Sequence, residues 1–252
     1  MVRDPCDTEN ILFYNVGASC FTEVAILGIR FERRFDSPSP PDDLPAPALH
    51  YHRYERAAPG RPFLYWREHE LLGDFGDVAL PRLTEETRPV AVWLPVRRAA
   101  LDTLPDAASD RRSLQPFALR LRLHAPRPRP EPVRIIKPLL DGTIAAFQRH
   151  DGSQLDDVAQ RLAAQLSSSV AEIAPLLVDP RAALLGAGRL VVLRAAGVQW
   201  QPADDRCVAC ELVVEEGNAD EGLVLRGTLW TAQPSVRATS DRPERRRPVQ
   251  SA

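Results

Sequence analysis

Apolar and polar residues alternate over residues 117–124, and four apolar side chains fall on one face of the segment: Phe117, Leu119, Leu121 and Leu123. A period of two is typical of a strand with one buried face. Further strands are predicted at 189–193, 207–214 and 222–230. Together these segments predict a sheet in the second half of the chain.

Helical patterns follow the first of these strands. Asp141 is a natural N-cap for an apolar helix over residues 142–149. Residues 153–178 predict a pair of helices. The first carries an apolar stripe, and the second begins at a capping box formed by Ser169 and Glu172.

This order of strands and helices predicts an α+β fold, with a small mixed sheet packed by helices. We expect an N-terminal region of unknown role over residues 1–110. A core follows over 111–232, with the helical pair 153–178 as an insertion. The Arg- and Pro-rich tail, 233–252, is predicted to be disordered.

The N-terminal region contains a proline-rich segment, residues 36–48, that predicts a surface loop. Proline removes a backbone donor and restricts the residue before it, which disfavours a helix or a central strand. Residues 49–98 hold many of the aromatic residues and predict short strands and turns, and residues 102–115 predict a loop.

Length and composition bound the class of protein. The 252 residues, 44% of them hydrophobic, are enough for one large domain or two small ones. No apolar stretch approaches the roughly 20 residues of a membrane-spanning helix, and the first residues lack the apolar run of a signal peptide. Four cysteines are too few for a disulfide framework in a chain of this size. We therefore expect a soluble cytoplasmic protein with reduced thiols and no membrane partner.

The formal net charge of −2 hides an uneven distribution. Residues 36–86 hold ten acids and five arginines, whereas residues 111–134 hold seven arginines and a single acid, Glu131. The arginine-rich segment favours a local anionic partner, although a solvated strand face and loop explain it equally well. The whole chain is less basic than a dedicated nucleic-acid binder usually is.

Two short motifs place carboxylates where elements begin. Lys137-Pro-Leu-Leu-Asp141 leads into the expected helix, and Asp204-Asp205-Arg-Cys-Val208 precedes the strand over 207–214. Carboxylates at the start of a helix and of a neighbouring strand can converge, and Mg²⁺ requires such oxygen ligands. A metal held there generates hydroxide for phosphodiester hydrolysis. A helix N-cap and a turn explain the same residues without a metal.

On these motifs, residues 116–216 resemble the RusA-type Holliday-junction resolvases. The pattern of that family is Lys-Pro-Asp-x-Asp-Asn opening a helix after a strand, then Asp-Asp-x-Gln-Val opening a later strand. The matching positions here are Lys137, Pro138, Asp141, Asp204, Asp205 and Val208. The family members are small homodimeric, Mg²⁺-dependent endonucleases that cut branched DNA.

The resemblance implies a homodimer whose partner is branched or duplex DNA. It implies a possible Mg²⁺ ion held by the catalytic carboxylates Asp141, Asp204 and Asp205. Phosphate contacts are expected from the basic residues near the first motif: Arg127, Arg129, Arg134 and Lys137.

The chain departs from the family pattern at several positions. The first aspartate of the family falls on Leu139, and the asparagine on Gly142. The helix lysine falls on Ala145 and the glutamine on Cys207. Our first hypothesis is a nucleic-acid-processing protein that acts as a Mg²⁺-dependent endonuclease on branched DNA. Leucine cannot bind a metal, and this favours the second hypothesis, a non-catalytic RusA-like binding or assembly module with a degenerate metal site. The third hypothesis is an unrelated α+β protein.

Two further features favour structural explanations. Cys207 and Cys210 have the spacing of a zinc or redox motif, but they lie in an apolar strand, where residues three apart point to opposite faces. We expect buried structural thiols. The helical pair has the rhythm of a helix-turn-helix, but its second helix carries no Arg, Lys, Asn or Gln to read bases, which favours a plain helical hairpin.

Overall fold

The computed structural model describes residues 27–34, 51–84, 86–104, 115–195, 197–218 and 220–235. In this part of the chain, six strands form one mixed sheet: β1 (Gly28–Arg34), β2 (Tyr51–Arg56), β3 (Trp66–Leu80), β4 (Phe117–Ala125), β9 (Cys207–Glu216) and β10 (Leu223–Pro234). The proline-rich loop expected at 36–48 and residues 236–252 of the expected tail lie outside the described residues. The first tail residues, Gln233 and Pro234, belong to β10, so the prediction of disorder is wrong there.

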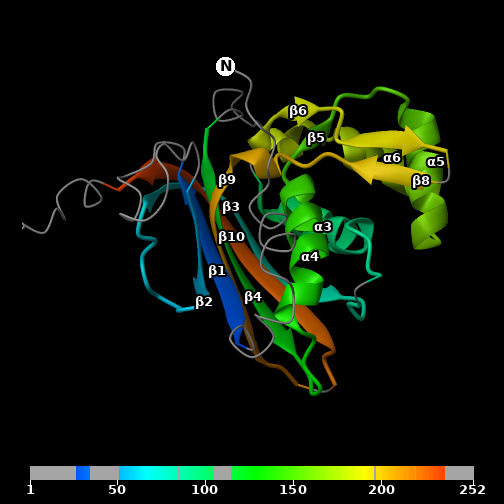
Figure 1. Ribbon diagram of the computed structural model, residues 1–252. Helices are drawn as coiled ribbons and strands as arrows, with labels where there is room; N and C mark the ends of the chain where they lie inside the picture. Colours follow the sequence, from blue (N-terminus) through cyan, green and yellow to red (C-terminus); the bar gives the residue numbers. More distant parts are fainter. Residues whose placement is uncertain are drawn as a thin grey trace, which may run out of the picture.

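The strands lie across the sheet in the order β2-β1-β9-β4-β10-β3 (Figure 1). β4 and β9 form a parallel pair at its centre, and every other neighbouring pair is antiparallel. The prediction that strand 117–124 pairs in one sheet with the strand near Cys207 is therefore confirmed. Strands from before residue 110, β1, β2 and β3, flank the three strands from after it on both sides, so the expected N-terminal region and core share one sheet.

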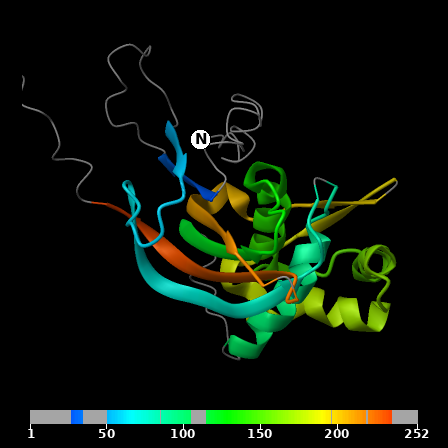
Figure 2. The same ribbon diagram turned by 90° about the horizontal axis from the view of Figure 1, so that it is seen from below.

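Four helices pack against the sheet: α3 (Val90–Thr103), α4 (Pro132–Ala146), α5 (Leu155–Leu166) and α6 (Val170–Val178). Figure 2 shows the strands curving around α3 and α4, which lie on one side of the sheet. The predicted helical pair is confirmed in α5 and α6, and Ser169 Oγ accepts a 3.2 Å hydrogen bond from the backbone N–H of Glu172.

Short elements join these helices to the sheet. Two 3₁₀ turns are η2 (Pro180–Leu185) and η3 (Asp204–Arg206). Two small ribbons pair β5 (Arg149–His150) with β6 (Ala187–Gly188) and β7 (Val191–Arg194) with β8 (Gly197–Trp200). η3 ends where β9 begins, so the second acidic motif lies at one end of the central parallel pair.

Helix α3 contradicts the prediction of strands and turns over residues 49–98. Its valines and Trp93 have a strand-like propensity, and Pro95 lies inside it. The buried positions nevertheless follow a helical stripe: Val92, Trp93, Val96, Arg97 and Ala100. Burial of this stripe against the sheet overrides the local preference.

Helix α4 begins nine residues before Asp141, so the predicted N-cap role of Asp141 is wrong. Pro138 lies inside the helix rather than ahead of it. The apolar stripe of α4 starts at Ile135 and continues through Leu139 and Ile144, all buried. Packing of this stripe offsets the hydrogen bond that proline cannot make.

Gly142 sets how closely α3 and α4 approach each other. A Cβ atom at this position would lie 2.6 Å from the carbonyl oxygen of Pro89 and 3.0 Å from the backbone nitrogen of Trp93. Backbone atoms have little freedom to move away. The close packing of α3 and α4 therefore explains why Gly142 stands at the position of the family asparagine.

Arg97 is fully buried between α3 and α4. Its Nη2 donates to the carbonyl oxygens of Ala145 and Gln148, at 3.1 and 2.5 Å, where α4 ends. A cation at the C-terminal end of a helix complements the helix dipole. Burial lowers the pKa of Arg97 to about 9, and the charge of Asp179 partly opposes this effect.

Cys207 and Cys210 are buried thiols, as predicted, but both belong to the main core. A register shift in the β4–β9 pair lies between Phe117, opposite Cys207, and Ala118, opposite Ala209. This irregularity changes the strict alternation, so the expectation of opposite faces is wrong. Within the described ranges, no helix is long and apolar enough to cross a membrane.

Candidate functional site

The predicted metal ligands come from two neighbouring elements. Asp141 lies on α4, Asp204 and Asp205 lie on η3, and these two elements contact each other. Asp141 is only 7% exposed, and its Oδ2 lies 3.5 Å from Nζ of Lys137, one turn earlier in the helix. Asp205 is half exposed, with Oδ1 4.0 Å from Nε of Arg206.

This arrangement does not fit a RusA-like Mg²⁺ site. The described residues contain no group of three or more His, Cys, Asp or Glu side chains placed to hold a metal ion. Leu139, at the family position of the missing carboxylate, is fully buried in the main core. A Mg²⁺ ion needs oxygen ligands close to octahedral geometry, and this side chain supplies none.

The predicted phosphate-binding arginines are paired with acids. Arg127 and Arg129 donate to the same carboxylate oxygen of Glu216, at 2.8 and 3.1 Å. The hydrogen bond and charge of Arg127 hold the pKa of Glu216 below its usual value. Arg134 donates to Glu131 at 2.8 Å. Glu216 and Glu131 therefore offset two of the three positive charges of these arginines.

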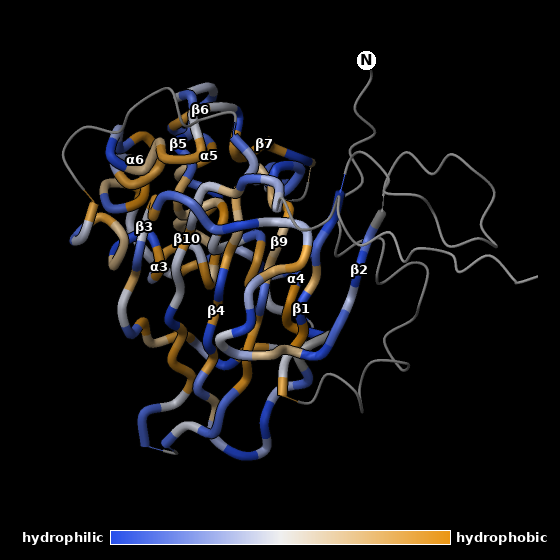
Figure 3. The backbone as a smooth tube through the Cα atoms, turned by 90° about the vertical axis from the view of Figure 1, so that its left-hand side faces the viewer, coloured by the Kyte–Doolittle hydropathy of each residue, from blue (hydrophilic) through white to orange (hydrophobic). Residues whose placement is uncertain are grey.

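A different charged cluster lies on the sheet face that carries no helix. Figure 3 looks onto this face, with β1, β9 and β4 side by side. The pairing registers set Arg30 of β1, Glu211 of β9 and Arg120 of β4 in one row across three strands. Their charges alternate, and opposite charges in neighbouring strands attract.

The distances within this row show strong coupling. Nη1 of Arg120 donates to Oε2 of Glu211 at 2.5 Å, and its Nε donates to Oε1 of Glu68 at 2.5 Å. Nη1 of Arg30 lies 4.0 Å from Oε1 of Glu211. Burial tends to lower the pKa of Arg120, but the hydrogen bonds and charges of the two glutamates keep that pKa above its usual value.

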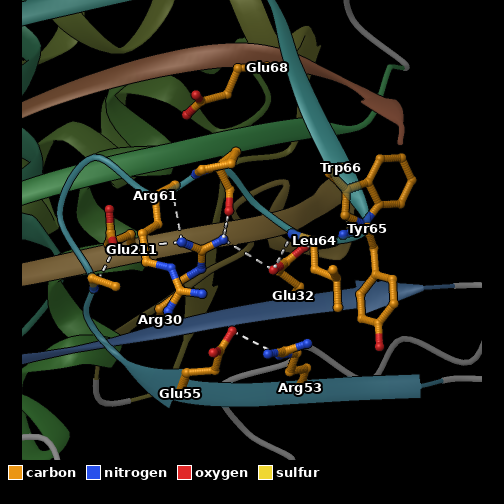
Figure 4. A network of polar contacts seen from close by, with 12 residues as sticks. Arg30, Glu32, Arg53, Glu55, Arg61, Leu64, Tyr65, Trp66, Glu68 and Glu211 are labelled. Atoms are coloured by element: carbon orange, nitrogen blue, oxygen red, sulfur yellow. Dashed lines mark hydrogen bonds and ion pairs between the residues drawn. The ribbon is translucent and has the colours of Figure 1, made fainter. Parts of the chain in front are cut away.

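Residues 57–65 form a loop that this cluster holds over the sheet (Figure 4). Glu32 accepts hydrogen bonds from the backbone N–H groups of Leu64 and Tyr65, at 2.9 and 2.8 Å. Arg30 donates to the carbonyl oxygens of Arg61 and Pro62, at 3.0 and 2.5 Å.

Two further side chains of the row hold the same loop. Glu211 accepts a 2.9 Å hydrogen bond from the backbone N–H of Ala58, and Arg120 donates at 3.0 Å to the carbonyl oxygen of Arg61. Charged side chains from three strands therefore satisfy the backbone of this loop.

Aromatic contacts complete the attachment of the loop. The Phe63 ring lies 4.4 Å from the guanidinium of Arg30 and 4.6 Å from that of Arg120, both distances to the ring centroid. Phe63 and Trp66 also join a small apolar cluster on this face with Ala118 and Val208. Cation–π contacts and apolar burial thus add to the hydrogen bonds.

An open hollow of about 600 Å³ lies beside this loop, and we call it the open-face cleft. Its charged lining consists of Arg30, Arg53, Glu55, Arg61, Arg67 and Glu68. A second hollow of about 270 Å³ shares Glu68 with it and is lined by Arg120 and Arg122. Both hollows lie on the helix-free side of the sheet.

The sequence gives only a partial signal for this site. Arg30 and Glu32 alternate with Ile29 and Phe31, which is the pattern of a strand with a polar face. Nothing local indicates that the polar face is buried under a loop, because the partners lie 31 to 153 positions away. The count of charges over residues 111–134 also leaves out Glu211, which the parallel β4–β9 pairing places beside Arg120.

Comparison of the chain with protein-family models, with curated proteins and with solved structures gives no match. The RusA resemblance therefore rests on the motif residues themselves.

Proposed function

We propose that the chain is a non-catalytic RusA-like module that binds nucleic acid, with branched or duplex DNA as its partner. A cytoplasmic homodimer without a functional Mg²⁺ site is part of this proposal. The observation that carries it is the contrast between two groups of side chains. Four arginines line one open cleft, whereas the carboxylates expected to cut DNA do not gather around one point in the described residues.

The state of the carboxylates favours binding over cleavage. Asp141 is largely buried and ion-paired with Lys137, and a carboxylate in that state already has a cation as its neighbour. Leu139 is packed in the core, so a bridging carboxylate at that position would have to be buried there. The parallel β4–β9 pair with α4 between the two strands in sequence agrees with the strand–helix–strand order of the RusA pattern.

The test is a paired binding and cleavage assay on the full chain. Labelled four-way junction, duplex and single-stranded DNA are titrated at about 50 mM salt, and the measurement is repeated as salt rises. We expect binding that weakens steeply with salt, because contacts to phosphate release counterions. We expect no strand cleavage with either Mg²⁺ or Mn²⁺.

The two outcomes separate the hypotheses. Metal-dependent cleavage that is lost in Asp205→Asn would support the endonuclease in place of the non-catalytic module. No binding to any of the three DNAs at low salt would reject both nucleic-acid hypotheses and leave an unrelated α+β protein.

A further inference from the structure

We infer that the open-face cleft is the nucleic-acid site, and that Arg61 and Arg67 contact the phosphate backbone there. The inference rests on the proposed function and assigns a site to it. The RusA resemblance implies phosphate contacts from the arginines near residue 130. The inference assigns these contacts to Arg61 and Arg67 instead, which lie outside the segment that the resemblance covers.

The charge balance of the cleft favours an anion. Glu55 pairs with Arg53 at 2.8 Å, and Glu68 pairs with Arg120 from the neighbouring hollow. Arg61 and Arg67 are exposed, and in the described ranges neither forms an ion pair with a carboxylate. Arg67 donates a hydrogen bond to the neutral amide of Gln233. Both guanidinium groups therefore keep their positive charge uncompensated by a near acid.

The loop that carries Arg61 is fixed before any ligand arrives. Arg30 donates to the carbonyl oxygen of Arg61, and Glu32 accepts from the backbone N–H groups three and four residues further on (Figure 4). Arg120 donates to the same carbonyl oxygen of Arg61. A preformed binding loop loses less conformational entropy on association than a mobile one. The ordering of this loop is thus achieved in the free protein.

The buried charges under the loop are hard to explain by stability alone. Arg30, Glu32 and Glu211 are each at most 3% exposed. Ion pairs taken out of water repay their desolvation poorly, and apolar residues of similar volume often stabilise a fold as well or better. Holding a loop backbone in one conformation is a task that apolar side chains cannot perform, because they offer no hydrogen bonds to its N–H and carbonyl groups.

The lining indicates a polymer backbone rather than a small organic ligand. Small-molecule pockets are mostly apolar with a few polar groups, whereas six of the twelve residues that line this cleft are charged, and the cleft opens to solvent. Its volume of about 600 Å³ exceeds what a single phosphate needs. Arginine contacts to phosphate position a nucleic acid without reading its sequence, so we expect sequence-independent binding.

The arginines near residue 130 provide a matched comparison. Arg127 and Arg129 share the carboxylate of Glu216, so a phosphate that binds either guanidinium competes with that carboxylate in an exchange of partners. Arg61 and Arg67 need no such exchange. Arg61, Arg67 and Arg127 are exposed, whereas Arg129 is partly buried, so the melting temperature of the Arg127 and Arg129 variant is compared with that of the wild type.

The experiment measures fluorescence anisotropy of labelled duplex and four-way junction DNA against the full chain and two double variants. Arg61→Ala with Arg67→Ala is expected to weaken binding by about tenfold or more and to reduce the salt slope by about one per lost phosphate contact. Arg127→Ala with Arg129→Ala is expected to change affinity less than about threefold. Thermal melting of each variant checks that the fold is retained.

Two results would overturn the inference in distinguishable ways. If the wild-type chain binds DNA and only the Arg127 and Arg129 variant loses affinity, the cleft is not the site while the proposed function stands. If the wild-type chain binds no DNA, both the function and its site are rejected. Equal losses in both variants would contradict the assignment to the cleft alone.

Discussion

Arg120 lies directly opposite Glu211 in the central parallel pair, and its Nη1 donates a 2.5 Å hydrogen bond to the glutamate Oε2. The two residues are 91 positions apart in the sequence. This contact joins the arginine-rich segment to an acid from the far side of the helical insertion. It makes Glu211 the centre of the charged row, and its removal is the most direct test of that row.

Glu211→Gln should destabilise the protein by about 1–3 kcal/mol, because it removes a buried, charge-assisted hydrogen-bond acceptor of Arg120. Arg120 keeps its pair with Glu68 and Arg30 keeps its pair with Glu32, so neither arginine loses every acid. Glu215→Gln is the matched control on the same strand, since Glu215 is one-third exposed and pairs with the exposed Arg122. We expect less than about 1 kcal/mol there. Urea denaturation of both variants measures the difference, and equal losses would contradict a special role for Glu211.

Gly142→Ala should cost about 1–3 kcal/mol, since a methyl group forced between two packed helices must push a backbone aside. The added Cβ would lie 2.6 Å from the Pro89 carbonyl oxygen. Gly76→Ala is the control, because a Cβ at that position meets nothing within 4 Å. The free energies of unfolding of the two variants are compared. A harmless Gly142→Ala would mean that α3 and α4 separate easily.

Leu162→Ala and Ile173→Ala should each cost about 2–5 kcal/mol, because both side chains are fully buried in the main core. Val170→Ala, at an exposed position of α6, should cost much less. For the same reason, deletion of residues 153–178 should unfold the whole protein, as seen by circular dichroism. A folded deletion variant would instead make the helical pair an accessory to the sheet.

Asp179→Asn should lower the free energy of unfolding near neutral pH, and the difference from the wild type should disappear in acid. The hydrogen bond from Arg181 holds the pKa of Asp179 below its usual value, and Asp179 also caps η2 through the backbone N–H of Arg181. A carboxyl whose pKa is lower in the folded state than in the unfolded state stabilises the protein at any pH above the unfolded-state pKa, which is about 4. This contribution is lost as the pH falls through the folded-state pKa.

We therefore expect the Asp179→Asn variant to be less stable than the wild type at pH 7 by roughly 0.5–1 kcal/mol. The difference should shrink progressively below about pH 4. Denaturant midpoints measured from pH 3 to 7 test this. A gap that stays constant with pH would show that the charge of Asp179 contributes nothing.

The spacing of apolar residues predicted those elements in which the local propensity of the sequence and the packing in the fold favour the same secondary structure. The alternation at Phe117–Leu123 became β4, and the capping box at Ser169 began α6 where expected. Helix α3 was missed because its composition favours strands, and only the spacing of its buried residues shows a helix. The start of α4 was misplaced because proline was treated as a barrier, although tertiary packing accommodates Pro138.

Charge patterns along the chain predicted less about the site. Counting charges in a continuous segment treats neighbours in sequence as neighbours in space. Glu216 offsets one of the two charges of Arg127 and Arg129, and it lies near them only because β9 runs beside β4. The open-face cleft combines residues of β1, β2, β3 and the loop before β3, and no local rule brings these together.

The parallel pairing of β4 with β9 has a consequence for how the chain is made. β1 is synthesised first of the six described strands, yet its sheet neighbours are β2 and β9, and β9 leaves the ribosome only after the helices α3 to α6. Pairings across such long stretches of sequence slow folding. Until β9 arrives, β1 and β4 each keep an open edge that a strand of another chain can occupy. The late arrival of β9 between β1 and β4, followed by that of β10 between β4 and β3, therefore completes the six-stranded sheet and covers these inner strand edges.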